Sequence, residues 1–205
     1  MAKLRGAGLD VREEQILTPL VTLEEYIREK GYTSVFALAN SLVHQHLCEQ
    51  LPEVRFEYEP GLNQLVALTY DTGLTYEKLR RSATLLNADP DMDYMATHGD
   101  ACCPSEEGPL PDVGGLIALM RTTNSREPNH IFGKLSPSLL APVLRRFAPH
   151  QVAVVGDRLY TDKAMADAVG IDFVCVLSGE TTRESLAAYR GTPSRVVVET
   201  LGDLA

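Results

Sequence analysis

The sequence predicts an α/β protein built on a parallel sheet, and three observations support this class. Several short apolar segments have the length and β-branched composition of strands buried on both faces of a sheet. Segments with residues typical of helix starts and stops separate these strands along most of the chain. From residue 114 onward, strand and helix alternate regularly, which implies parallel pairing with right-handed crossovers.

The helices of the first half are marked by the residues at their ends. Thr22 and Glu25 form a capping box that predicts a helix start, and Gly31 predicts its end. A second helix is expected at 41–51, and Thr75 is expected to cap a third. Each of these helices is expected to lie between two strands.

The strands of the first half are expected to differ in burial. The segment 54–58 alternates apolar and polar residues, which is typical of a half-exposed strand, whereas 65–70 is more apolar and therefore more buried. The full set of expected strands in this half is 15–18, 34–38, 54–58, 65–70 and 93–97.

Residues 97–115 are rich in Gly, Pro, Cys and acidic residues and fit neither a helix nor a strand period. Such a stretch is typical of an active-site loop or a crossing between domains. A helix is then expected at 114–123, and Ser136 followed by proline predicts a further helix start.

The last third repeats the strand-and-helix order. Gly170 is expected to end a helix that begins after Thr161. Thr181 and Glu184 predict a second capping box. The expected strands here are 152–155, 173–177 and 196–198.

Composition limits the function classes. The chain has 205 residues, of which 44% are hydrophobic and 23% charged, with a formal net charge of −9. An acidic protein lacks the basic face of a general nucleic-acid or membrane-surface binder. No apolar run approaches the roughly 20 residues of a membrane span. We therefore expect no nucleic-acid or membrane partner. The four cysteines lack zinc-type spacing, and a reduced, cytoplasmic setting is expected.

Three charged residues could perform phosphate chemistry. Asp157 follows a buried strand, where open α/β sheets bind ligands, and Asp162 comes five residues later. Two such carboxylates suit Mg²⁺, which commonly brings a phosphate. Lys134 lies just ahead of a predicted helix start, where an anion is favoured. Taken singly, each has a structural explanation as a strand end, a helix cap or a solvated lysine, but their order along the chain favours function.

Four segments together resemble the haloacid dehalogenase (HAD) superfamily. Its closing motifs are a lysine, here Lys134, and an acidic pair after a strand, here Asp157 and Asp162. Three further segments are similar to the type IIA branch, the nitrophenyl-phosphatase-like sugar- and nucleotide-phosphate phosphatases. They are 68–79, with Tyr-Asp followed by Thr-Tyr-Glu-Lys-Leu, the loop at 96–112 and the residues at 177–182. This resemblance extends over nearly the whole chain.

The resemblance implies a Rossmann-like parallel-sheet core with an inserted α/β cap domain. We expect the core at 1–31 and 113–205 and the cap at 32–112. The resemblance further implies that Asp157 contacts Mg²⁺ and that Asp162 supports the metal or the lysine.

The resemblance also assigns the residues that would hold the substrate, a small phosphorylated molecule. Lys134 would bind the phosphate, while Thr97, His98 and Asp100 would contact the substrate from the loop. The family more often has Asn-Pro where this chain has His98-Gly99, which leaves the preferred leaving group open. A homo-oligomer formed through the cap is compatible with the resemblance.

One part of the family pattern is missing from this sequence. Members carry a strand ending in Asp-x-Asp-x-Thr or -Val, whose first aspartate is the nucleophile, and two central strands of the core are likewise not recognised here. Asp91-Met-Asp93 is a poor substitute because no apolar strand precedes it.

We therefore expect a Mg²⁺-dependent phosphomonoester hydrolase that is inactive as this chain, incomplete at its N-terminus. The alternative is a non-catalytic remnant that binds a phosphorylated ligand or a partner protein. A receiver-like domain is disfavoured because it would need an N-terminal acidic cluster.

Overall fold

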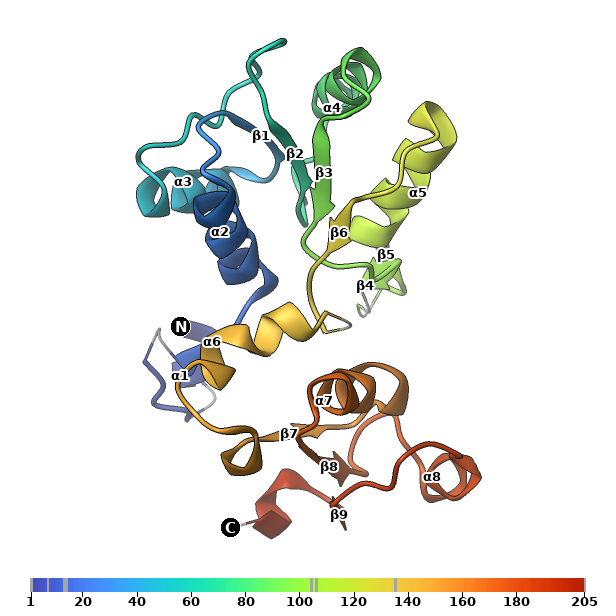
Figure 1. Ribbon diagram of the computed structural model, residues 1–205. Helices are drawn as coiled ribbons and strands as arrows, with labels where there is room; N and C mark the ends of the chain where they lie inside the picture. Colours follow the sequence, from blue (N-terminus) through green and yellow to red (C-terminus); the bar gives the residue numbers. More distant parts are fainter. Residues whose placement is uncertain are drawn as a thin grey trace. The chain divides into compact units, whose positions relative to one another are not determined.

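The computed structural model describes residues 2–6, 8–12, 15–103, 105, 107–134 and 136–204. Contacts within the chain divide it into two compact units, Met1–Gly133 and Lys134–Ala205 (Figure 1). Both units contain parallel strands separated by helices, so the predicted α/β class is confirmed. Among the described residues, the structure has no helix long and apolar enough to cross a membrane.

The first unit is built on a four-stranded sheet whose neighbouring strands all run parallel, in the order β1-β2-β3-β6. Every residue of the first two strands is buried, as expected for a sheet covered on both faces. The strands are β1 (Val35–Leu38), β2 (Leu65–Leu68), β3 (Asp93–Ala96) and β6 (His130–Ile131).

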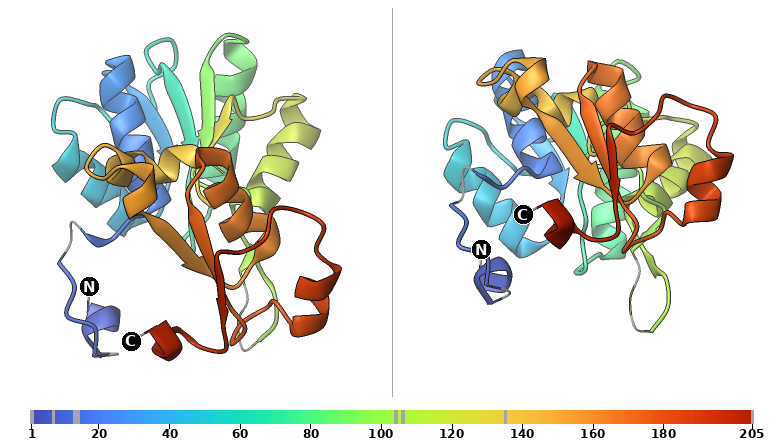
Figure 2. Two further views of the ribbon diagram at one scale, coloured as in Figure 1. Left: turned by 60° about the horizontal axis from the view of Figure 1, so that its bottom comes forward. Right: turned by 90° about the horizontal axis from the view of Figure 1, so that it is seen from below.

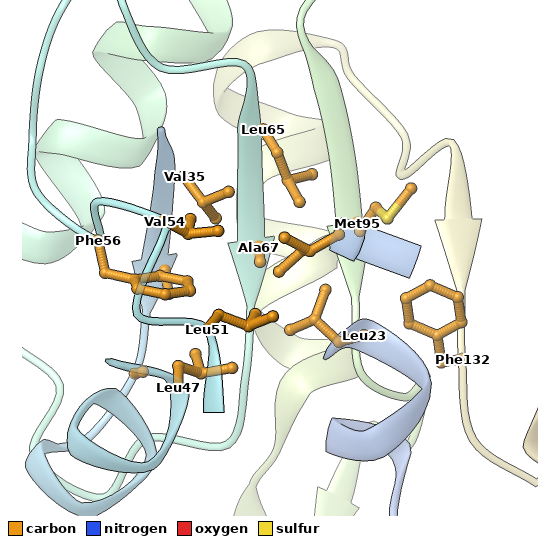
Figure 3. Close-up of a cluster of buried hydrophobic side chains, with 13 residues drawn as sticks. Leu23, Val35, Leu47, Leu51, Val54, Phe56, Leu65, Ala67, Met95 and Phe132 are labelled. Atoms are coloured by element: carbon orange, nitrogen blue, oxygen red, sulfur yellow. The ribbon is translucent and has the colours of Figure 1, made fainter. Parts of the chain in front are cut away.

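Two pairs of helices cover the faces of this sheet (Figure 1). On one face, α2 (Pro19–Lys30) and α3 (Ser41–Gln50) contribute Leu23 and Leu47 to a buried cluster (Figure 3). On the other face, α4 (Tyr76–Ala88) and α5 (Val113–Asn124) pack on the side chains of β1, β2 and β3 that point the opposite way. The result is a three-layer unit in which β1, β2 and β3 contribute alternate residues to two cores.

Capping explains where these helices begin. Thr75 Oγ1 accepts a hydrogen bond from the backbone of Lys78, as predicted for α4. Asn40 does the same for α3. The start of α2 was predicted wrongly, because the helix begins four residues earlier at Pro19, with Thr18 as its cap. Proline suits the first helical position because the amide hydrogen it lacks would have no helical partner there.

Two expected strands are not strands in the structure. Residues 15–18 form no ladder, and 54–58 contribute only an isolated bridge between Arg55 and Ser34. Between β3 and α5, a two-stranded antiparallel hairpin, β4 (Cys102–Cys103) with β5 (Leu110–Pro111), occupies the stretch predicted to be irregular. Each of its strands has two residues, which is too short to produce a periodic sequence pattern.

The second unit contains a three-stranded parallel sheet in the order β7-β8-β9, visible in orange and red in Figure 2. A core of Phe173, Cys175, Met165 and Ala166 joins this sheet to the helix that follows β7. The elements are η2 (Pro137–Leu140), α6 (Ala141–Leu144), η3 (Pro149–Gln151), β7 (Ala153–Gly156), α7 (Ala164–Val169), β8 (Asp172–Val176), α8 (Arg183–Ala188), β9 (Val196–Val198) and η5 (Leu201–Leu204).

Three details of this unit differ from the predictions. The chain from Leu159 to Lys163 forms a π-helical turn before α7 begins. The second capping box uses Thr182 and Ser185, one residue later than predicted. Strand β7 lies at the edge of the described sheet, and its Val155 is 43% exposed rather than buried.

Helix α2 packs on one face of the sheet in the first unit, and α5 packs on the other face. The expected division into a core at 1–31 and 113–205 and a cap at 32–112 stays a prediction. A short helix, α1 (Ala2–Gly6), precedes these elements in the first unit.

Candidate active site

Lys134 and Asp162 form an ion pair in the second unit. Lys134 Nζ lies 3.0 Å from Asp162 Oδ1. The lysine side chain is 54% exposed and the carboxylate only 7% exposed. The lysine therefore neutralises a buried carboxylate while part of its ammonium group stays accessible to an anion.

The position of Asp162 depends on the π-helical turn and on Gly156. A Cβ atom placed on Gly156 would lie 2.6 Å from Asp162 Oδ2, closer than real Cβ atoms approach such an atom. Only glycine at the end of β7 therefore leaves room for this carboxylate. Single π-helical turns are frequent at functional sites, and this one places Asp162 against the carboxyl end of β7.

Asp157 is anchored to the loop that follows β8. Its backbone carbonyl accepts hydrogen bonds from the amide and the hydroxyl of Thr181, the latter at 2.6 Å. Its Oδ2 accepts a hydrogen bond from the Glu180 amide at 2.8 Å. A Cβ on Gly179 would overlap the Asp157 carboxylate. Only glycine at this position therefore lets the loop pass the carboxylate. The negative charge of Asp157 also reaches Cys175, whose pKa is raised mainly by burial and further by this carboxylate.

These carboxylates suit a magnesium ion. Asp157 directly follows β7, and Asp162 packs on the last residue of that strand. Within the described ranges the structure has no group of three or more His, Cys, Asp or Glu side chains placed to hold a metal. Mg²⁺ is usually held by only one or two carboxylates, and water and substrate phosphate complete its shell. Two carboxylates at one end of a parallel strand therefore fit this ion.

A second lysine in the same unit, Lys163, has a structural role. Its side chain is 1% exposed, and its Nζ lies 2.8 and 2.9 Å from the two carboxylate oxygens of Asp167. The ammonium also lies over the rings of Phe173 and Tyr189. Lys163 is thus enclosed and paired, so Lys134 is the better candidate for phosphate binding.

In the first unit, Thr97 and His98 belong to a chain of hydrogen bonds at the end of β3. His98 Nε2 lies 2.7 Å from Asp112 Oδ1, and His98 Nδ1 lies 3.1 Å from the Thr97 hydroxyl. Asp112 Oδ1 also accepts from the Val113 amide and caps α5. The histidine ring is thereby held in a fixed orientation.

Asp100 differs from the other predicted loop residues because its side chain is not part of this chain of hydrogen bonds. The residue is exposed, and its backbone carbonyl accepts from the Gly114 amide at 2.8 Å. A Cβ on Gly114 would lie 2.5 Å from the Gly99 carbonyl oxygen. This glycine therefore lets the start of α5 lie directly on the loop.

The structure thus brings Lys134 together with Asp162, and Thr97 with His98. Sequence reasoning missed Asp112, which holds the histidine. Its capping of α5 had a local signal, since an aspartate between a loop and an apolar helical segment is typical of a helix cap, but its contact with His98 had none. The requirement for glycine at 156 and 179 was also missed. It arises only because Asp162 and Asp157 pack directly on these residues in the folded chain.

The chain is similar to several known phosphatases. Residues 131–204 match the family described as HAD-hydrolase-like. The crystal structure of a 4-nitrophenylphosphatase from Thermotoga maritima is 33% identical, with a TM-score of 0.87, and the match covers 99% of this chain and 76% of that one. A p-nitrophenyl phosphatase from Archaeoglobus fulgidus is 27% identical, with a TM-score of 0.86 and coverage of 99% and 78%. An acid sugar phosphatase of Staphylococcus haemolyticus is 28% identical over 187 residues, which are 90% of this chain and 69% of that protein.

Proposed function

This chain belongs to the HAD-type phosphatases of the IIA branch, and we propose that it provides the metal- and phosphate-binding residues of a Mg²⁺-dependent phosphomonoester hydrolase. The observation that carries the proposal is the Lys134–Asp162 pair beside the carboxyl end of β7, where Asp157 follows. The substrate is a small phosphorylated metabolite such as a sugar or nucleotide phosphate. The relatives of this chain that are named as sugar and nitrophenyl phosphatases support this class of substrate.

Each of the three charged residues has a role that its geometry supports. Phosphoryl transfer requires the spread negative charge of the phosphoryl oxygens to be neutralised. Lys134 would bind one of these oxygens through the exposed part of its ammonium group, while Asp162 holds the lysine in place. Asp157, with Asp162, would hold Mg²⁺, which when bound neutralises further phosphoryl charge.

The loop residues would contact the remainder of the substrate. We assign Thr97, His98 and Asp100 to this role because they follow β3, at the carboxyl end of a parallel strand. Asp112 fixes the imidazole of His98, so the ring would present a defined edge to a substrate. Asp100 has an exposed side chain that is available for hydrogen bonding.

We further propose that the 205-residue chain by itself does not turn over aryl phosphates. A covalent mechanism needs a carboxylate nucleophile, and the sequence contains no Asp-x-Asp-x-Thr or -Val segment after an apolar strand. Asp93 is excluded as a substitute because it opens β3 and accepts hydrogen bonds from Tyr26 and Tyr32. Turnover by the purified chain that is abolished in Asp157→Asn would contradict this proposal.

Calorimetric titration with Mg²⁺ and inorganic phosphate tests the binding roles. We expect the chain to bind phosphate more tightly in the presence of Mg²⁺, Asp157→Asn to remove this coupling, and Lys134→Met to weaken phosphate binding. Arg195→Met is a matched control, because Arg195 forms an exposed, 3.7 Å pair with Asp172 in the same unit. Equal phosphate affinity in Lys134→Met and Arg195→Met would refute the assignment of Lys134.

We also propose a cytoplasmic location, supported by the cysteines. Within the described residues, Cys48, Cys102 and Cys175 are not joined in disulfides, as is usual in a reducing compartment.

A further inference from the structure

The first unit has a cavity of about 300 Å³ along the outer side of β1. This strand ends the sheet, and β2 is its only ladder neighbour among the described strands (Figure 1). On the outer side, Arg55 forms an isolated parallel bridge with Ser34, and the pairing then stops. Residues 56–58 line the cavity opposite β1. The cavity therefore lies in the plane of the sheet, where the next residues of a further strand would pair.

The backbone of Ala37 presents a donor and an acceptor to this cavity. Val35 donates its amide hydrogen to the Arg55 carbonyl on the outer side of β1, whereas the Leu38 carbonyl accepts from Thr69 on the side of β2. Because backbone groups alternate between the two sides of a strand, the N–H and C=O of Ala37 point outward like those of Val35. Among the hydrogen bonds of the described residues, neither group has a partner on this side. Ala37 is only 9% exposed, so a ligand with complementary groups is favoured there.

Aromatic side chains border the cavity above and below the plane of the sheet. Phe36 and Tyr58 belong to the core on the face of α4 and α5, and their ring centroids lie 5.8 Å apart. Phe56 belongs to the core on the opposite face, beside β1 (Figure 3), and its centroid lies 6.3 Å from that of His44. All four side chains line the cavity. A flat ring lying in the plane of the sheet would therefore have aromatic groups on both sides.

The charged groups around the cavity do not favour an anion. Lys78 Nζ makes hydrogen bonds to Asp71 and to two backbone carbonyl oxygens, which uses its three donors. Arg81 Nε lies 2.7 Å from Glu77 Oε1. Glu57 adds a further negative charge to the lining. An uncharged ligand therefore suits this cavity better than a phosphate.

We propose that this cavity binds the lactam edge of an uncharged nucleobase such as uracil. The N–H and C=O of a lactam stand side by side, so the ring N–H donates to the Ala37 carbonyl while the ring carbonyl accepts from the Ala37 amide. The volume lies at the lower end of the range for small-ligand sites, roughly 300–1,000 Å³, and suits a single ring system. None of the residues assigned to phosphate, metal or substrate contact lines this cavity, so the site is independent of the proposed hydrolysis.

Titration of the full chain with uracil, followed by amide NMR, tests the proposal. We expect a saturable shift of the Ala37 amide signal, with millimolar affinity, on the order expected for so small a ligand. Dimethyluracil, methylated at both ring nitrogens, keeps the flat ring and its carbonyls but has no N–H donor. It should bind about tenfold more weakly at this site, because the hydrogen bond to the Ala37 carbonyl is lost.

A pair of tyrosine variants locates the site. Tyr58→Ala removes part of one aromatic wall and should weaken uracil binding about fivefold or more. Tyr76→Ala is the matched control, because Tyr76 is 80% exposed and does not line the cavity. It should bind uracil as the unchanged chain does. Should Tyr58→Ala fold poorly, the comparison of uracil with dimethyluracil on the unchanged chain decides alone. Absence of the Ala37 shift, equal affinity for the two ligands, or equal effects of the two tyrosine variants would each overturn the proposal.

Discussion

Lys134 Nζ and Asp162 Oδ1 lie 3.0 Å apart, and they join the segment before η2 to the π-helical turn after β7. The pair is asymmetric, because the carboxylate is buried while the lysine is half exposed. Burial makes the carboxylate dependent on its partner, and exposure leaves the lysine able to bind an additional anion. A single contact thus holds the buried carboxylate and leaves the lysine accessible to the phosphate of the proposed substrate.

Removing the lysine should therefore destabilise the second unit. Lys134→Met leaves the Asp162 carboxylate buried without this partner, which should cost about 1–2 kcal/mol, a value reduced by solvent screening of the exposed lysine. Urea unfolding measures the loss. Arg195→Met should cost far less because its pair is long and exposed. The double variant Lys134→Met/Asp162→Asn should be more stable than the sum of its single effects implies, and strict additivity would contradict direct coupling.

Gly179 should tolerate no side chain. In Gly179→Ala the new methyl group would overlap the Asp157 carboxylate, so the loop or Asp157 must move. We expect a loss of about 1–3 kcal/mol in stability together with weaker Mg²⁺ binding, measured by urea unfolding and calorimetry. Gly202→Ala is a suitable control, since its methyl group would meet only Thr200 Oγ1 at 3.5 Å. Unchanged Mg²⁺ affinity in Gly179→Ala would show that Asp157 does not contact the metal.

Much of the fold could be predicted from sequence because buried parallel strands are apolar along their whole length. Apolar runs predicted the strands at β1, β2, β7, β8 and β9, although Val196 and Val197 of β9 are 42% and 41% exposed. The prediction of a strand at 54–58 was wrong. The alternation arises because Val54 and Phe56 pack in the core, while the segment forms only an isolated bridge. The hairpin of β4 and β5 was beyond such reasoning because its pairs depend on tertiary contacts.

The candidate site was only partly predictable for a related reason. Acidic residues after a strand and a lysine before a helix start carry a local signal, so Asp157, Asp162 and Lys134 could be named. Sequence alone left open whether Asp162 serves the metal or the lysine, and the 3.0 Å pair shows the lysine contact. The role of Asp112 in holding His98 is a contact between the two ends of a loop, which no local pattern reveals.

Two tyrosines of the first unit should respond oppositely to loss of their hydroxyl groups. Tyr94 is fully buried, and its hydroxyl has no hydrogen-bond partner in the described structure. Tyr94→Phe should therefore be neutral or stabilise the fold by up to about 1 kcal/mol, because an unsatisfied polar group is removed. Tyr32 donates a hydrogen bond to Asp93, so Tyr32→Phe should cost about 1 kcal/mol. Urea unfolding of both variants tests the pair, and a large loss in Tyr94→Phe would reveal a partner for its hydroxyl.

Acid should weaken the fold partly through Glu77 at the start of α4. Hydrogen bonds from Arg80 and then Arg81 lower the pKa of this carboxyl from 4.5 to about 2. Because the pKa is lower in the folded state, the stabilisation is present above pH 4.5 and is lost as the pH falls through about 2. The urea midpoint of the unchanged chain should therefore fall more between pH 6 and pH 2.5 than that of Glu77→Gln.

The difference between the two chains isolates Glu77 from the other acidic groups. Glu53→Gln, which removes an exposed carboxylate after α3, should keep the acid response of the unchanged chain. Because Glu77 is exposed, 1 M salt should screen its attraction to Arg80 and Arg81. The difference in acid response between the unchanged chain and Glu77→Gln should therefore become smaller. Identical acid responses of Glu77→Gln and the unchanged chain at low salt would show that these arginines do not stabilise the folded helix.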